Sequence, residues 1–135
     1  MKVFISHAST DAQLARQVAD ALRASGFNVW DDTQVYPGEN WAAQAAQALQ
    51  ESDAMVVLLT PDSLRSPNVN SEVGFALGQR SYKGRLIPVL VGSPEQLSLQ
   101  DIPWILKQFQ VIHLSAPEGD DNSLQQIVRA LKEAA

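Results

Sequence analysis

An α/β domain built around a parallel sheet is the fold class that the sequence predicts, and three observations lead to it. Short apolar runs are separated by segments of helical spacing, so that strand and helix alternate five times. Three of these runs are almost continuously apolar, as is typical of strands that are covered on both faces. The 135 residues, 45% of them hydrophobic, suffice for a single domain with a substantial core over residues 1–135.

The expected strands are rich in Val, Ile, Leu and Phe. They lie at 2–6, 27–30, 54–59, 85–91 and 109–114. The expected helices have apolar side chains on one face, three or four residues apart. They lie at 14–22, 41–49, 73–80 and 124–131. A fifth segment, 95–107, is only weakly helical because Pro103 interrupts it. Thr10 and Gln13 fit a capping box for the first helix.

Five strand-helix units fit a flavodoxin-like sheet of strand order 2-1-3-4-5, with right-handed crossovers and helices on both faces. Ligands of such sheets bind beyond the carboxyl ends of strands 1 and 3, where the strand order reverses. The segments that leave these strands are 7–11 and 60–70, which we expect to be loops. The second loop leads directly to Glu72, the one carboxylate in residues 65–79. The topology therefore places Glu72 at the rim of the predicted cleft.

Glu72 has two interpretations. Acidic side chains are favoured in the first turn of a helix by the helix dipole, and an N-cap at Asn68 or Asn70 would put Glu72 near that turn. The alternative is a functional carboxylate in the cleft. The predicted location favours this alternative, as does the lack of any Lys or Arg between Arg65 and Arg80.

The composition argues against several classes of function. A net charge of −5 disfavours binding of nucleic acid through neutralised phosphates. Cysteine is absent and the chain has only two histidines, so we expect neither a disulfide nor a metal site. No apolar run approaches the ~18 residues of a membrane span. The apolar part of the N-terminus is too short for a signal peptide, so we expect a cytoplasmic protein without a membrane partner.

Polar residues at the strand ends do not match several known kinds of site. Asp31 and Asp32 follow the second strand, whereas a phospho-accepting receiver domain needs its acidic pair after the first strand, where this chain has His7. Nucleophile-elbow, dinucleotide-binding and P-loop glycine motifs are absent from the sequence. Ser9 or Thr10 is expected to cap the first helix. His7 is then either a donor to a phosphate or an exposed loop residue.

Two further features concern glycine and a long loop. Gly74 and Gly78 form a GxxxG pattern, which we interpret as close packing of a helix against the sheet. Residues 31–41 are long for a strand-to-helix connection, with a turn at Pro37 and an exposed Tyr36 beside it. Long loops at the carboxyl ends of strands usually bind something, so this loop is a candidate binding segment.

Three stretches together resemble the TIR domain, especially its bacterial branch: VFISHASTDAQLARQVADALRASGFNVWDD, PGENW and ESDAMVVLLTPDSLRSPNVNSEV. The resemblance runs in order from residue 3 to about residue 92, and the rest fits the family's length. Residues 31–41 resemble the BB loop, through which TIR domains contact each other. Its tip comprises Tyr36, Pro37, Gly38 and Glu39. The spacing from Ser66 to Glu72 is similar to the motif of the catalytic glutamate in NAD-cleaving members.

The resemblance implies a reaction and a set of site residues. Glu72 would be catalytic, and the substrate NAD+ would be cleaved at the nicotinamide-ribose bond without a cofactor or metal. The residues expected to bind it are Ser6, His7, Ala8, Asp32, Trp41, Ser66 and Asn68. Asn68 is a departure, since many of these enzymes have Trp there. Attack by water would give ADP-ribose, and attack by an internal atom would give a cyclic isomer.

Two other functions stay open. Many TIR domains are adaptors that only assemble with other TIR domains, and the loop at 31–41 would then be the whole function. A nucleoside deoxyribosyltransferase has a related fold and a glutamate nucleophile. For the enzyme, the resemblance implies activity in a self-assembled oligomer, in bacterial immune signalling or cell suicide. A sensor domain or a partner protein would then trigger assembly.

Overall fold

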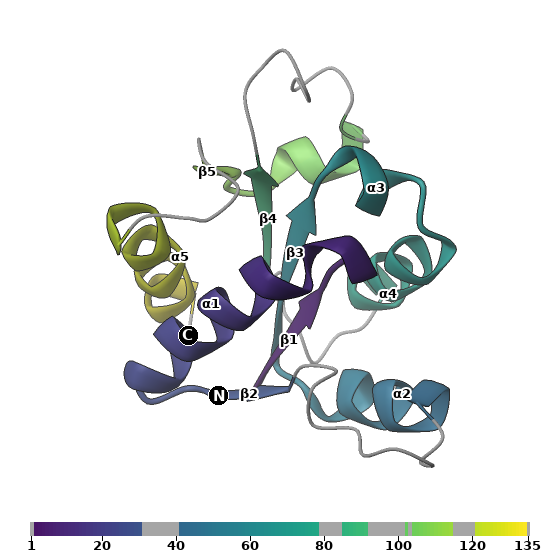
Figure 1. The fold of residues 1–135 in the computed structure, drawn as a ribbon, viewed down its shortest axis with the longest axis horizontal. Coiled ribbons are helices and arrows are strands. Elements are labelled where there is room, and N and C mark those ends of the chain that lie inside the picture. The colour runs from purple at the N-terminus through teal and green to yellow at the C-terminus, as the bar shows by residue number, and fades with distance from the viewer. Residues whose placement is uncertain are drawn as a thin grey trace.

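The fold is seen in a computed structural model, which describes residues 2–30, 41–78, 85–91, 102, 104–114 and 121–134 (Figure 1). Five parallel strands form one sheet of order β2-β1-β3-β4-β5. The predicted fold class and strand order are thereby confirmed. The strands are β1 (Lys2–Ser6), β2 (Asn28–Trp30), β3 (Ala54–Leu59), β4 (Leu86–Val91) and β5 (Ile112–Leu114).

Helices connect the strands. The α-helices are α1 (Ala12–Ala24), α2 (Trp41–Glu51), α3 (Pro61–Leu64), α4 (Pro67–Gly78) and α5 (Asp121–Ala134). Two 3-10 helices, η1 (Ser9–Asp11) and η5 (Trp104–Gln108), complete the described elements. Strand β5 starts later than predicted, because η5 ends in a turn in which the Phe109 amide donates to the Leu106 carbonyl. Of the predicted weak helix at 95–107, the structure describes only η5 and Ile102.

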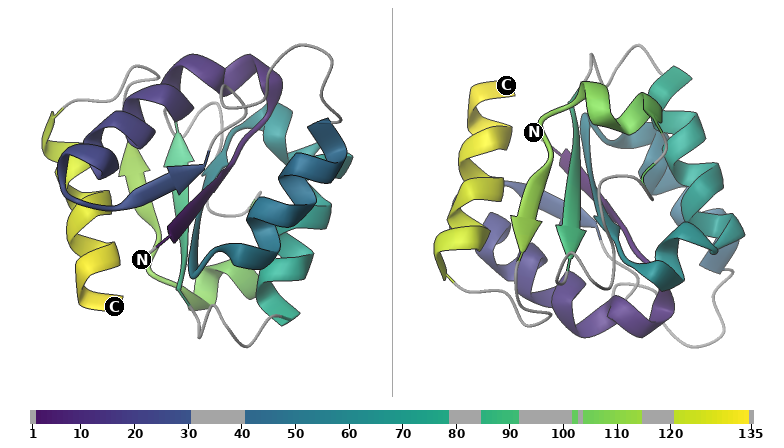
Figure 2. Two further views of the ribbon diagram at one scale, coloured as in Figure 1. Left: turned by 90° about the horizontal axis from the view of Figure 1, so that it is seen from below. Right: turned by 90° about the horizontal axis from the view of Figure 1, so that it is seen from above.

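The sheet is covered on both faces, as Figure 2 shows, by α1 and α5 on one side and by α2 and α4 on the other. Strand β3 is buried at all six positions and supplies both layers. Val56 and Leu58 belong to the core under α1 and α5, whereas Met55 and Val57 belong to the core under α2 and α4. Burying each such side chain contributes about 1.5–3 kcal/mol to the hydrophobic free energy of folding.

The register of β1 decides where the polar end of that strand lies. Ser6 pairs with Val57, so β3 continues for two residues beyond the end of β1. Because side chains alternate along a strand, Ser6 projects from the same face as Phe4, which belongs to the core under α2 and α4. Ser6 therefore faces the helix layer that contains Glu72.

The predicted start of the first helix is wrong. Helix α1 begins at Ala12 after the turn η1, its N-cap is Asp11, and no side chain makes a capping hydrogen bond there. The hydroxyl of Thr10 instead donates to the carboxylate of Asp62, 52 positions along the chain. A contact between residues this far apart in the chain has no local sequence signal. The capping-box pattern therefore predicted a role for Thr10 that the structure does not show.

The predicted loop at 60–70 is also wrong, because it contains α3 and the start of α4. Thr60 and Ser63 form a reciprocal capping box around the first turn of α3, and Pro61 occupies a position where its missing amide hydrogen is not needed. The interpretation of Gly74 and Gly78 as packing residues is wrong too. A Cβ added at either glycine would meet no atom from the other described segments of the chain within 4 Å.

Candidate functional site

Glu72 projects from α4 toward the end of β1. The Ser6 hydroxyl donates to Glu72 Oε1 across 2.7 Å. This is the short distance expected when a hydroxyl donates to an ionised carboxylate. Ser6 is 1% exposed and Glu72 is half-buried. The Ser6 hydroxyl, which is largely shielded from water, therefore orients the Glu72 carboxylate.

Helix α4 begins earlier than either asparagine N-cap would require. Ser66 precedes its first residue, and the Val69 amide donates to Ser66 Oγ at 3.3 Å, which is the bond of an N-cap. Pro67 follows in the position that tolerates a missing amide hydrogen. Glu72 thus lies in the second turn, beyond the first turn in which the helix dipole favours acids. The interpretation of Glu72 as a first-turn dipole residue is therefore wrong.

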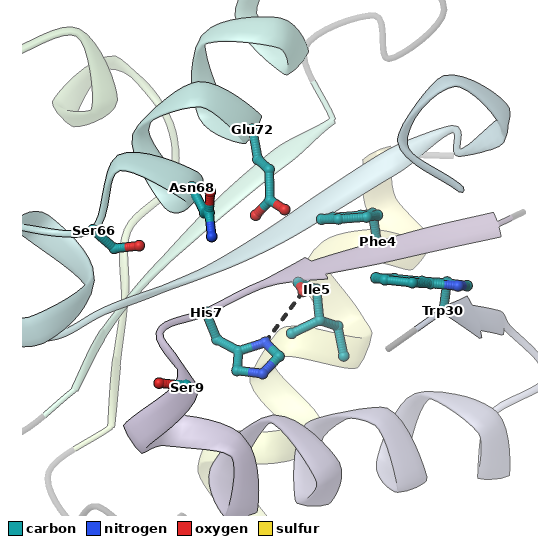
Figure 3. A pocket seen from close by; sticks show the side chains of 8 residues that line it. All are labelled: Phe4, Ile5, His7, Ser9, Trp30, Ser66, Asn68 and Glu72. Carbon is teal, nitrogen blue, oxygen red and sulfur yellow. Dashed lines mark hydrogen bonds between the residues drawn. The ribbon is translucent and has the colours of Figure 1, made fainter. Parts of the chain in front are cut away.

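A cavity of about 140 Å³, here called cavity I, opens beside this carboxylate (Figure 3). Its lining residues come from the ends of β1 and β2 and from α4 and the segment before it. They are Phe4, Ile5, His7, Ser9, Trp30, Ser66, Asn68 and Glu72. Figure 3 shows Glu72 and Asn68 projecting from α4 toward β1, with His7 on the opposite side of the space.

His7 is half-buried in the wall of cavity I, so the interpretation as an exposed loop residue is wrong. Its Nδ1 lies 3.4 Å from the carbonyl oxygen of Ile5. In the tautomer that carries its proton on Nδ1, the ring donates to this carbonyl, because a carbonyl oxygen only accepts hydrogen bonds.

An aromatic pair forms the floor of cavity I. Phe4 and Trp30 stack with their ring centroids 5.1 Å apart and their planes 9° from parallel. The two residues are partners in the β1–β2 register, and Trp30 is 9% exposed. The sequence interpretation missed both. The available signal was strand alternation, which puts Phe4 on the same face as Ser6.

Two hydrogen bonds, here called the rim clamp, join the segments that leave β1 and β3. Thr60 Oγ1 donates to Asp11 Oδ2 at 2.7 Å, and Thr10 Oγ1 donates to Asp62 Oδ2 at 2.9 Å. Thr60 is buried and also accepts from the Ser63 amide at 3.1 Å. The clamp therefore fixes the segment containing His7 relative to the segment that leads into α4.

A second cavity, cavity II, has a volume of about 310 Å³ and lies between α2 and α4. It is lined by Ala45, Ala46, Leu49, Asn68, Ser71, Glu72 and Phe75. Asn68 and Glu72 line both cavities, so they form the wall between them. Two cavities that share Asn68 and Glu72 were not predicted from the sequence, and no local sequence pattern indicates them.

Of the predicted site residues, the structure brings together Ser6, His7, Ser66, Asn68 and Glu72. Ala8 is buried and is not among the described residues that line either cavity.

The remaining predicted site residues are not described. Asp32 and the loop residues Tyr36, Pro37, Gly38 and Glu39 lie outside the described residues. Trp41 begins α2, but its side chain is not described. Within the described part of the chain, no group of three His, Asp or Glu residues is arranged to hold a metal ion. None of the described helices is long and apolar enough to cross a membrane.

The family model described as "TIR domain" matches residues 3–128 of the chain. The chain belongs to the TIR domain family. The resemblance inferred from the sequence is thereby confirmed at the level of the family. A search of curated proteins finds no match.

Solved structures share the fold of this TIR domain. A metazoan TIR-STING receptor from C. gigas is 24% identical with a TM-score of 0.74, and the match covers 96% of this chain and 38% of that one. The chain thus spans well under half the length of that receptor. The TIR domain of a Toll-related receptor from Hydra magnipapillata is 15% identical with a TM-score of 0.69, covering 98% and 96%. A CMP N-glycosidase from Clostridium botulinum is 15% identical with a TM-score of 0.58, covering 94% and 97%.

Proposed function

We propose that this TIR domain cleaves the bond between nicotinamide and ribose in NAD+, with Glu72 as the catalytic carboxylate. The observation that carries the proposal is the hydrogen bond from buried Ser6 to Glu72 at the wall shared by two cavities. Membership of the TIR family supports it, because the Ser66-to-Glu72 spacing resembles that of NAD-cleaving members. NAD+ is a substrate here, and the reaction needs no cofactor.

The chemistry suits a single carboxylate. When the bond from ribose C1′ to the ring nitrogen breaks, the nitrogen keeps the electron pair and the cationic ring leaves as neutral nicotinamide. No proton has to be supplied to the leaving group, unlike in most glycosidases, which use two carboxylates. The positive charge then develops on the ribose, where the Glu72 carboxylate stabilises it electrostatically. Water would yield ADP-ribose and a proton, and an internal nucleophile would yield a cyclic isomer.

The neighbouring residues receive separate roles in this proposal. Ser6 positions the carboxylate by donating to Oε1, and Ser66 caps α4 while it also lines cavity I, where we expect it to bind the substrate. Asn68 contributes an amide to both cavities where many NAD-cleaving relatives have Trp. The buried Phe4–Trp30 stack lines cavity I, where it offers an aromatic surface in the absence of that Trp.

Assembly is the second part of the proposal. Cavities I and II, of about 140 Å³ and 310 Å³, meet at Glu72, where the bond would be cleaved. For the part of the dinucleotide farther from this bond, we assign the binding surface to another TIR domain in a homo-oligomer. The loop tip at 36–39 remains the predicted contact. A sensor domain or partner protein would raise the local concentration in a cytoplasmic immune or cell-suicide response, without nucleic acid or membrane contacts.

The test of catalysis is chromatographic analysis of NAD+ incubated with concentrated protein. We expect nicotinamide to appear, together with ADP-ribose or its cyclic isomer. Glu72→Gln keeps the shape and removes the charge, so the rate should fall about a hundredfold or more while the melting temperature barely changes. Glu133→Gln, which removes one negative charge at an exposed position of α5, serves as the matched control for altered charge. A Glu72→Gln rate within a few-fold of the wild type would contradict the assignment.

The alternatives give different results in the same assay. A pure adaptor leaves NAD+ intact at every protein concentration. An enzyme resembling a nucleoside deoxyribosyltransferase leaves NAD+ intact but exchanges the base of a deoxynucleoside. CMP is included as a third substrate because a CMP N-glycosidase has a similar fold, and release of cytosine would identify that specificity.

The test of assembly is a dilution series of the same reaction, with light scattering on each sample. We expect the specific activity to rise with protein concentration, since a neighbouring molecule completes the site. Replacing Tyr36 and Pro37 by Ala should lower activity and self-association together and leave the melting temperature unchanged. Constant specific activity from a sample that stays monomeric would contradict the assembly proposal.

A further inference from the structure

Strand β2 lies at one edge of the sheet, and the backbone groups on the outer side of such a strand can pair with a strand of another molecule. The pairing of β1 shows which groups these are. The Asp53 amide donates to the Lys2 carbonyl at 2.7 Å, so the carbonyl of Lys2 faces β3. Because backbone groups alternate in direction along a strand, those of Val3 face β2.

The register then gives the direction of the backbone groups of Val29, the middle residue of β2. Val3 is opposite Val29, and in a parallel ladder a residue bonds to the two neighbours of the residue opposite it. Those two neighbours are Asn28 and Trp30. The amide and the carbonyl of Val29 therefore point away from β1, toward the outer edge of the sheet.

A side chain from α1 occupies the outward carbonyl of Val29. Arg23 Nη2 donates to this oxygen at 3.1 Å, and Arg23 Nη1 lies 3.8 Å from Oδ1 of Asp20, one turn earlier in the helix. A strand that paired with β2 would need the same carbonyl as an acceptor. Beside β2 lies a cavity of about 330 Å³ that Arg23, Phe27 and Val29 help to line, so the described residues leave space on this side.

The end of α1 brings Arg23 within reach of the edge. Gly26 has a φ of 96°, a left-handed conformation that suits glycine, and its amide donates to the Arg23 carbonyl. The Phe27 amide donates to the Leu22 carbonyl, which completes a Schellman motif. The chain thus reverses within a few residues, and β2 begins beside the last turn of α1.

We propose that Arg23 closes the β2 edge to a second copy of this chain. Two β2 strands related by a two-fold axis would place Val29 opposite its own equivalent, where each amide donates to the carbonyl of the other copy. Arg23 opposes this pairing because it bonds to the acceptor and brings a positive charge close to the Arg23 of the second copy. Self-association is thereby directed to other surfaces, whether or not the protein cleaves NAD+.

The test compares Arg23→Met with the wild type by analytical ultracentrifugation over a dilution series. Methionine keeps an unbranched apolar side chain but has neither the donor nor the charge. Arg16→Met is the matched control, because it removes the same charge from an exposed position of the same helix. Arg23→Lys keeps a charged donor, so it should behave as the wild type.

We expect Arg23→Met to associate at protein concentrations about tenfold lower than the wild type, since each new backbone hydrogen bond contributes modestly to the affinity. Hydrogen exchange measured by mass spectrometry identifies the surface that pairs. Residues 28–30 of Arg23→Met should become more protected as the protein associates, because the new ladder includes the amide of Val29. Arg16→Met should match the wild type in both measurements.

Three results would overturn the inference. A lower melting temperature of Arg23→Met with unchanged association would leave Arg23 only a structural role. Association without added protection at 28–30 would show that the variant aggregates through other surfaces. Equal association of Arg16→Met would show that loss of charge alone is the cause. If Arg23→Met does not fold, Arg23→Gln, a shorter neutral side chain, is measured instead, with the same expectation.

Discussion

The sheet face under α1 and α5 is buried by aliphatic side chains, whereas the face under α2 and α4 includes the Phe4–Trp30 stack and adjoins Glu72 and both cavities. One strand supplies both faces. Val3 and Ile5 of β1 enter the aliphatic core, and Phe4 and Ser6 point the other way. Both faces thus bury apolar side chains at the strands, and they differ in that the second face also adjoins the carboxylate of Glu72.

The helices reflect this difference. Both α1 and α5 separate apolar from polar residues sharply around the helix, which suits a layer that only packs. In α4 that separation is weak, because its buried residues are Val69, Val73 and Ala76 but the apolar Leu77 lies on its exposed side. Close packing around Glu72 would leave no space for a ligand. We therefore expect mutations on the first face to change stability and mutations on the second face to change activity.

The largest effect on stability is expected from Leu131→Ala in α5. Leu131 is fully buried in the aliphatic core. Its truncation should cost about 2–5 kcal/mol in the free energy of unfolding, through lost burial and a residual cavity. Urea denaturation measures this change, and Arg129→Ala on the exposed side of the same helix should stay within about 0.5 kcal/mol.

Activity sharpens the comparison between the faces. Folded Leu131→Ala protein should cleave NAD+ at the wild-type rate although its stability is reduced. Glu72→Gln protein should have normal stability and little activity. A large drop in the rate for folded Leu131→Ala would show that the aliphatic face also shapes the site. The separation of the two faces would then be contradicted.

A smaller effect is expected from Thr60→Val in the rim clamp. The change keeps the volume and removes the hydroxyl that donates to Asp11 and caps α3. Loss of the cap and of one hydrogen bond should cost about 1–2 kcal/mol. Because the clamp positions the segment that contains His7, kcat should also fall by about three- to tenfold with KM nearly unchanged.

Thr60→Ser is the control for the clamp, since serine restores the hydroxyl and should restore kcat. Thr10→Val removes the other bond of the clamp at an exposed position, so it should lower kcat with little loss of stability. If Thr60→Val lowers the melting temperature and leaves kcat unchanged, the clamp has a purely structural role and the predicted effect on catalysis is contradicted.

Part of the candidate site was predictable from the sequence because it depends on topology. Once the alternating runs indicate a doubly wound sheet, the ends of strands 1 and 3 must lie side by side. Ser6 ends strand 1, and the segment after strand 3 leads to Glu72. Alternation within the strand would also have placed Phe4 beside Ser6. The start of α4 was harder to predict, because Ser66, Asn68 and Asn70 are all good N-caps. Only the structure shows that Ser66 is the one that caps the helix.

The sequence by itself determined the alternation of strands and helices, the parallel sheet and the family, because these depend on the periodicity and order of residues close together in the chain. Only the tertiary structure decided the contacts that make the site. Ser6 and Glu72 are separated by 66 positions and Thr10 and Asp62 by 52, and the two cavities depend on how α4 packs beside β1 and beside α2. Such contacts follow from strand register and helix placement, which the whole core fixes together.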